Sequence, residues 1–181
     1  GGFWYEGPDF KKQHKFYPST PVDPHGYSKD FFAFTDDFNH DGWDDILVIG
    51  FPGESTDWYE NPKGKEGDWA KHPVAKVTDN ESPTYGDLTG DGKKELIFMT
   101  GGQFGWAEPN PNDPYAEWTF HKATPNKGYQ RFTHGMGYGD VNGDGKMDLL
   151  EARGWWEQHQ QASMSEVRTS YDPNMEPFLR H

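Results

Sequence analysis

An acidic loop that occurs three times at nearly constant spacing is the feature that most constrains the fold. Each copy reads D-x-[N/T]-x-D-G-x-x-[D/E] and is followed directly by an apolar run. The copies begin at Asp37, Asp87 and Asp140, which are 50 and 53 residues apart. A repeat of this length, built from short strands and turns, is typical of four-stranded propeller blades. We therefore expect an all-β fold of antiparallel blades.

The segments around the loops have the composition of β-strands. Residues 31–34, 46–49, 96–99 and 118–120 are short, rich in aromatic or β-branched side chains, and bounded by turn residues. No segment shows a sustained period of about 3.6 residues. The 22 Gly and 14 Pro also leave little room for helices.

The repeat extends beyond the loops and divides the chain into units. A W-x-E motif or its close variant recurs at Trp4, Trp58, Trp106 and Trp155. We predict propeller blades in residues 1–157, made up of the end of one blade in 1–20, two blades at about 25–75 and 76–125, and a partial blade from about 126. Residues 158–181 do not follow the pattern and stay unassigned. Propellers close with about four to eight blades, so we expect part of a larger propeller, while a four-bladed closure or assembly from several chains stays open.

The oxygen-bearing positions of each loop suit a hard divalent cation. Calcium takes about six to eight oxygen ligands at roughly 2.3–2.6 Å, whereas magnesium demands stricter octahedral geometry. Positions 1, 3, 5 and 9 offer side-chain oxygens, position 7 can offer its backbone carbonyl, and glycine at position 6 permits the sharp turn. The predicted ligands are Asp37, Asn39, Asp41, Trp43, Asp45, Asp87, Thr89, Asp91, Lys93, Glu95, Asp140, Asn142, Asp144, Lys146 and Asp148. We expect about three calcium ions, with the weakest binding in the second loop because Thr89 replaces asparagine.

Two alternatives compete with this interpretation. A single acidic turn can form by side-chain hydrogen bonding without any metal, although three copies in register disfavour that explanation. An EF-hand would place a glutamate at position 12, and only the third loop has one, at Glu151; the other two have Val48 and Phe98. The strand-like flanks also disfavour the helices of an EF-hand.

Composition and charge narrow the partners. The formal charge is −13, and the sequence shows no basic patch that would bind a nucleic acid or an anionic membrane surface. No apolar stretch is long enough to insert into a membrane, and no cysteine is present for disulfides or thiolate metal sites. A divalent cation is the partner that this balance favours.

The repeated loop, followed by an apolar strand, resembles the FG-GAP/VCBS repeat family, which includes the propeller of integrin α-chains. The W-Y-E-N-P segment and the H-G-M-G-Y-G-D-V-N-G-D-G-K-M-D-L-L segment are similar to bacterial secreted members of that family. The resemblance covers roughly residues 1–157. It implies a propeller of seven or eight blades, calcium in the first hairpin of each blade, and a secreted, cell-surface or periplasmic location.

The sequence constrains the function of the chain less than it constrains the fold. We expect a calcium-stabilised module for adhesion or binding, with a protein or carbohydrate ligand, and more weakly an enzyme. Neither a nucleophile elbow, a P-loop nor a zinc-protease motif is present in the sequence. The alternative is a carbohydrate lyase or dehydratase with a site at the propeller channel. Its candidate residues are His134 and Tyr138, which alternate with glycines in the strand expected before the third loop.

Overall fold

The computed structural model describes residues 2–18, 21–159 and 164–168, and in these residues every regular element is a β-strand. The strands form three four-stranded antiparallel sheets and one two-stranded sheet. The predicted all-β, antiparallel fold is therefore confirmed. Because strands flank all three acidic loops, the EF-hand alternative is wrong.

Each four-stranded sheet is a meander in which consecutive strands are neighbours. The first sheet contains β3 (Asp30–Asp36), β4 (Asp45–Gly50), β5 (Glu54–Glu60) and β6 (Ala70–Thr78). The second contains β7 (Thr84–Gly86), β8 (Glu95–Thr100), β9 (Gln103–Glu108) and β10 (Thr119–Lys122). The third contains β11 (Gly137–Gly139), β12 (Asp148–Glu151), β13 (Gly154–Gln158) and β14 (Met164–Arg168). Strand β14 lies in the segment that the sequence left unassigned.

The N-terminal hairpin has the pattern of the last two strands of a four-stranded sheet. It consists of β1 (Phe3–Glu6) and β2 (Lys12–Lys15). Trp4 lies opposite His14, as Trp58 lies opposite His72 in the first sheet and Trp106 lies opposite His121 in the second. The hairpin therefore corresponds to β5–β6 and to β9–β10.

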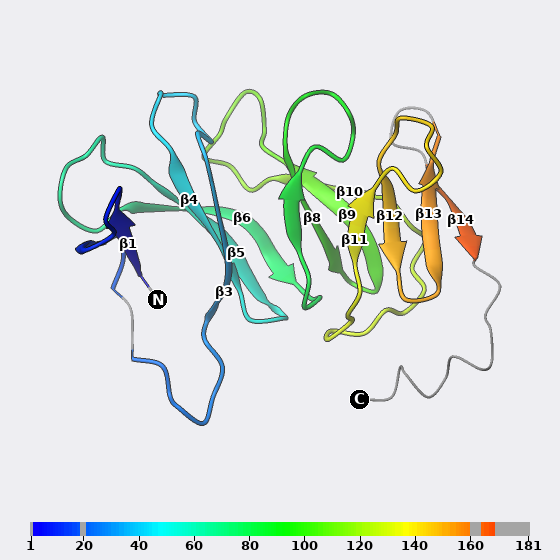
Figure 1. Cartoon of the computed structure of the whole chain (residues 1–181), viewed down its shortest axis with the longest axis horizontal. Helices are drawn as coiled ribbons and strands as arrows, with labels where there is room; N and C mark the ends of the chain where they lie inside the picture. The colour runs from blue at the N-terminus through cyan, green and yellow to red at the C-terminus, as the bar shows by residue number, and fades with distance from the viewer. Residues whose placement is uncertain (1, 19–20, 160–163, 169–181) are drawn as a thin grey trace.

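The sheets pack face to face in chain order, and their apolar clusters lie between them (Figure 1). Strand β4 shows how this arises from sequence. Its Leu47 and Ile49 pack toward the second sheet, while Ile46 and Val48 pack toward the N-terminal hairpin. A strand that is covered on both faces needs a continuous apolar run, which explains why the residues after each acidic loop do not alternate with polar ones.

The same alternation repeats in the second sheet. Leu96 and Phe98 of β8 face the first sheet, whereas Ile97 and Met99 face the third. Apolar burial contributes about 25 cal/mol per Å², so burial between the sheets stabilises the fold.

Candidate metal loops

The three acidic loops lie along one edge of the molecule. They connect the first two strands of each sheet and lie together at the top of the view (Figure 1). The glycine at position 6 has φ of +88°, +86° and +86° at Gly42, Gly92 and Gly145. This conformation costs little only without a Cβ, which is why the repeat keeps glycine there.

The carboxylate at position 1 organises each loop from inside. Asp37 accepts hydrogen bonds from the backbone N–H groups of Asp41 at 2.9 Å and Gly42 at 2.8 Å. Asp87 accepts from Gly90 at 2.7 Å and Gly92 at 3.0 Å. The equivalent Asp140 accepts from Gly143, Asp144 and Gly145. These bonds bend the backbone around the carboxylate, so later positions of the loop turn toward it.

The carboxylate at position 5 completes the turn. Asp41, Asp91 and Asp144 accept the backbone N–H of position 7 at 3.0, 2.8 and 2.9 Å. Position 7 itself is thereby placed at the tip of the turn, where the side chain of Trp43 is 44% exposed. The predicted role of the position 7 carbonyl stays a prediction.

The carboxylate at position 9 is buried and ties the loop to the sheet. Asp45, Glu95 and Asp148 are 0%, 1% and 0% exposed. Each accepts the backbone N–H of position 2 in its own loop, at 3.1, 2.8 and 3.0 Å. Position 9 therefore has a clear structural role that the sequence pattern did not distinguish from that of a ligand.

The second loop brings three carboxylates to one point. Ligand oxygens of Asp87, Asp91 and Glu95 all lie within 4.8 Å of one another. Oxygens on opposite sides of a calcium ion are separated by twice the bond length, or about 5 Å, so all three can contact one ion. Within the described ranges this is the only acidic group that converges so closely. The residues of the second loop therefore fit a hard divalent cation.

Burial and neighbouring charge shift the pKa values of the loop carboxyls. Burial raises the pKa of Asp45 to about 6, and the charges of Asp41 and Asp37 add to this, against hydrogen bonds from Asn61 and Phe38. Burial also raises the pKa of Glu95. In both cases the carboxylate is removed from water and lies beside other negative charges, which makes its ionised form less stable. A bound cation would offset this loss of stability.

The third loop carries its own cation. Lys146 Nζ lies 2.6 Å from Asp144 Oδ2. This hydrogen bond holds the pKa of Asp144 below its usual range. A lysine in this position partly neutralises the loop and competes with a metal ion for the same oxygen.

Position 3 differs between the loops in its contacts. The amides of Asn39 and Asn142 reach glutamates of the W-x-E motif in their own sheets. Thr89 instead donates its hydroxyl to Glu95 Oε1 at 3.1 Å. The sequence pointed to Thr89 as the weak position, but not to this replacement bond.

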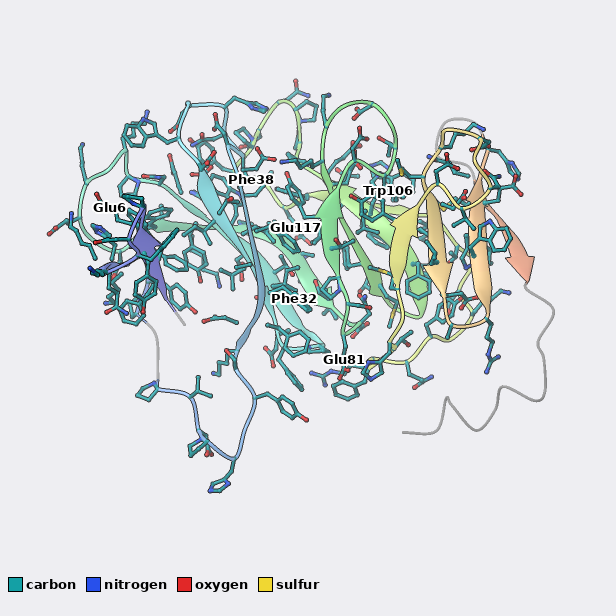
Figure 2. The ribbon with its side chains drawn as sticks, viewed as in Figure 1. Glu6, Phe32, Phe38, Glu81, Trp106 and Glu117 are labelled. Carbon is teal, nitrogen blue, oxygen red and sulfur yellow. The ribbon has the colours of Figure 1, made fainter. Side chains whose placement is uncertain are left out.

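His134 and Tyr138 are not brought into one cavity. His134 is in the segment before β11, and its Nε2 lies 2.8 Å from Glu81 Oε2. Glu81 is at the edge opposite the acidic loops (Figure 2). Tyr138 is in β11, and its hydroxyl occupies the space that a Cβ on Gly86 would need. His134 lines a cavity of about 620 Å³ with Glu151 and Arg153, and Tyr138 does not line it.

A Trp–His–Glu arrangement recurs in the N-terminal hairpin and in the first and second sheets. The ring centroids of Trp58 and His72 are 4.4 Å apart, and His72 Nε2 lies 3.1 Å from Glu60 Oε2. The same trio occurs as Trp4, His14 and Glu6, and as Trp106, His121 and Glu108. Recurrence of all three residue types in the sequence was the available signal, since their cross-strand register could not be known.

A repeat protein of stacked antiparallel sheets, each opening on an acidic hairpin, is the class that this fold and these loops define. Residues 37–98 match the family model of the FG-GAP-like repeat. This segment is similar to the FG-GAP-like repeat, which confirms the resemblance seen in the sequence. The match extends from the first acidic loop through the second loop into β8. Neither the curated proteins nor the solved structures contain a match.

No helix in the described part of the chain has the length and apolarity needed to cross a membrane.

Proposed function

We propose that the chain is a calcium-stabilised part of an extracellular β-propeller that binds a protein or carbohydrate ligand. The convergence of Asp87, Asp91 and Glu95 is the observation that carries the proposal. The face-to-face packing of three four-stranded sheets, together with the FG-GAP-like repeat, supports propeller blades. The same features support a secreted or cell-surface location and a larger propeller of seven or eight blades.

The loops would hold about three ions through positions 1, 3, 5, 7 and 9. Their carboxylates are oriented by backbone N–H groups before any ion binds, which lowers the entropy lost on binding. Calcium would supply the positive charge that balances the acidic side chains. Each loop joins the first and second strands of a sheet, so ion binding would stabilise that hairpin and leave the distant faces unchanged.

A cavity beside the first loop supports a binding role. It has a volume of about 720 Å³ and is lined by Trp4, Trp43 and Trp69, with polar side chains that include Glu6 and Asn61. Aromatic faces next to hydrogen-bonding groups suit stacking on a sugar ring or on a side chain of a protein partner. This cavity, rather than the one beside His134, is the binding surface that we favour.

Thermal unfolding in calcium and in chelator tests the proposal. An ion that binds the native state with Kd of about 10 μM adds about 2.7 kcal/mol per site at about 1 mM. We expect calcium to raise the Tm by many degrees and magnesium to raise it less. Asp91→Ala and Asp144→Ala should each remove one bound calcium in a titration, whereas Glu66→Ala, an exposed acidic residue outside the loops, should remove none. Identical melting in calcium and chelator would contradict the proposal.

The enzymatic alternative rests on the cavity at His134. A histidine that pairs with Glu81 and lines one cavity with Glu151 and Arg153 could act in proton transfer on a sugar. A turnover screen on polysaccharides tests this alternative. Activity that is lost in His134→Ala but kept in His25→Ala, a surface histidine outside the cavity, would favour it. Absence of turnover on every tested sugar would contradict the enzymatic alternative and favour the binding module.

A further inference from the structure

One hydrogen bond links the acidic loop to the third strand in the first sheet, and an equivalent bond does so in the third sheet. Asn39 Nδ2 donates to Glu60 Oε1 at 3.2 Å. Asn142 Nδ2 donates to Glu157 Oε1 at 3.1 Å. In both cases the asparagine occupies position 3 of the loop, and the glutamate belongs to the W-x-E motif. The bond therefore joins the same two positions of the repeat unit in two sheets of this chain.

This bond decides which end of the asparagine amide faces the loop. The second proton of Asn39 Nδ2 is directed at Asp41 Oδ2, 3.3 Å away, while Oδ1 accepts the backbone N–H of Asp41 at 3.1 Å. Asn142 Oδ1 likewise accepts the N–H of Asp144 at 3.0 Å. Since the nitrogen is held by the glutamate, the oxygen turns inward, and oxygen is the atom that calcium binds.

The glutamate of the first sheet is itself held in place. Glu60 uses Oε1 for Asn39 and Oε2 for His72, and the His72 ring packs on Trp58, which is fully buried. Trp58 and His72 are directly opposed on β5 and β6. Glu60 is only 27% exposed, so solvent screens its contacts weakly. The amide of Asn39 is thus anchored, through Glu60 and His72, to the core of the first sheet.

The second sheet contains a built-in exception. Its position 3 is Thr89, whose hydroxyl is directed at Glu95 of the same loop. Glu108 lies 2.8 Å from His121 Nε2, so the glutamate–histidine pair is present without an amide to orient. Glu108 is therefore a natural control for Glu60.

We propose that Glu60 and Glu157 are positioning residues for the metal loops, holding the asparagine oxygen of position 3 toward the ion. The inference rests on the proposed calcium binding. Groups that orient metal ligands typically change affinity by about 10- to 100-fold when they are removed. Glu60 and Glu157 would act through an amide rather than by contacting the ion.

Terbium luminescence isolates each loop for the test. Trp43 occupies position 7 of the first loop, so light absorbed by Trp43 can sensitise Tb³⁺ bound there. Trp43→Lys should lower that signal to the background given by Trp4 and Trp69, which line the same cavity. In the Trp43→Lys protein, Lys93→Trp or Lys146→Trp moves the reporter to the second or third loop. Both lysines are partly or fully exposed, so the replacement needs no repacking. Calcium then displaces Tb³⁺, which gives the affinity of one loop at a time.

We expect Glu60→Ala to weaken calcium binding at the first loop by about tenfold or more. Glu60→Gln keeps an acceptor oxygen for Asn39 but removes the charge, and should stay within about threefold of the unsubstituted chain. Glu157→Ala should weaken the third loop, and Glu108→Ala should leave the second loop within about twofold. If Glu60→Gln weakens calcium binding as much as Glu60→Ala does, the negative charge of Glu60 and not its hydrogen bond to Asn39 supports binding, and the proposal is overturned. Equal losses in Glu60→Ala and Glu108→Ala at their own loops would also overturn it.

A readout in chelator separates positioning from metal binding. The side-chain NH₂ resonances of Asn39, assigned with Asn39→Ala, should move in Glu60→Ala and stay nearly unchanged in Glu60→Gln and Glu108→Ala. Unmoved Asn39 resonances in Glu60→Ala would contradict the inference. Absence of Tb³⁺ and calcium binding in the unsubstituted chain would instead contradict the proposed function, so the two failures are distinguishable.

Discussion

The Oδ1 atom of Asp45 accepts a hydrogen bond from the backbone N–H of Asn61 at 2.8 Å, although 16 residues separate the two. The other oxygen, Oδ2, accepts the N–H of Phe38 at 3.1 Å. One buried carboxylate thus connects the start of the acidic loop to the end of β5. Asp148 repeats the arrangement, with Gln158 at 2.9 Å and Val141 at 3.0 Å.

Asp45→Asn tests whether this carboxylate stabilises the fold without metal. An amide offers one acceptor oxygen, so one buried N–H loses its partner and faces an NH₂ group instead. We expect the free energy of unfolding in chelator to fall by about 1–3 kcal/mol at pH 7.5, measured by urea denaturation. Asp44→Asn changes an exposed neighbour and should alter it by less than about 0.5 kcal/mol. Equal effects of the two substitutions would mean that Asp45 matters only as a metal ligand.

The second sheet satisfies the same position differently. The residue after Glu108 is Pro109, which has no N–H to donate, whereas Asn61 and Gln158 follow the corresponding glutamates. Position 9 is accordingly the longer Glu95, and its free oxygen accepts the Thr89 hydroxyl at 3.1 Å. The hydrogen bond from Thr89 to Glu95 therefore replaces the one that Pro109 cannot donate.

A double-mutant cycle tests this compensation. Glu95→Asp shortens a fully buried side chain and should destabilise the protein by about 1–2 kcal/mol, because at least one of its three hydrogen bonds is lost. Pro109→Asn supplies the missing N–H and should recover part of that loss only in the Glu95→Asp background. The measurement is urea unfolding of both single variants and the double variant. Additive effects would show that residues 95 and 109 are not coupled.

The sequence predicted the loops and the strand type well because their causes are local. Glycine at position 6 needs positive φ, and the apolar run after each loop reflects a strand covered on both faces. The distinct role of position 9 was not predictable, since Asp41 and Asp45 are the same residue type and differ in burial and hydrogen-bond partners that only the fold reveals. The neighbours of His134 and Tyr138 could not be predicted either. They depend on how separate sheets approach each other, which one sequence does not specify. The role of Glu60 likewise required the register that places His72 opposite Trp58.

A buried tyrosine predicts how stability depends on alkaline pH. Burial, with the charges of Asp57 and Asp30, raises the pKa of Tyr59 to about 12, and its ring stacks on Tyr17 at 4.9 Å. The native state therefore keeps the Tyr59 proton between about pH 10 and pH 12, where the unfolded state has released it. The resulting stability is fully present below about pH 10 and is lost as the pH rises to about 12.

The matching measurement compares the free energy of unfolding of the unsubstituted chain with that of Tyr59→Phe. The difference should be constant below about pH 9.5 and should change by about 2–3 kcal/mol by pH 12, because one pKa unit corresponds to about 1.4 kcal/mol. A difference that stays constant through pH 12 would show that Tyr59 is solvated in solution.

Substituting the leucine opposite the recurring tryptophan tests whether the outer face of the third sheet is covered. Leu47 lies opposite Trp58, and Leu150 lies opposite Trp155, yet Leu47 is 0% exposed and Leu150 is 36% exposed. Leu47→Ala should cost about 2–5 kcal/mol because it opens a cavity between two sheets. Leu150→Ala should cost less than about 1 kcal/mol, since its side chain already contacts solvent. If Leu150→Ala destabilises as strongly as Leu47→Ala in urea unfolding, another sheet covers this face in solution, and sedimentation would then show whether a second copy provides it.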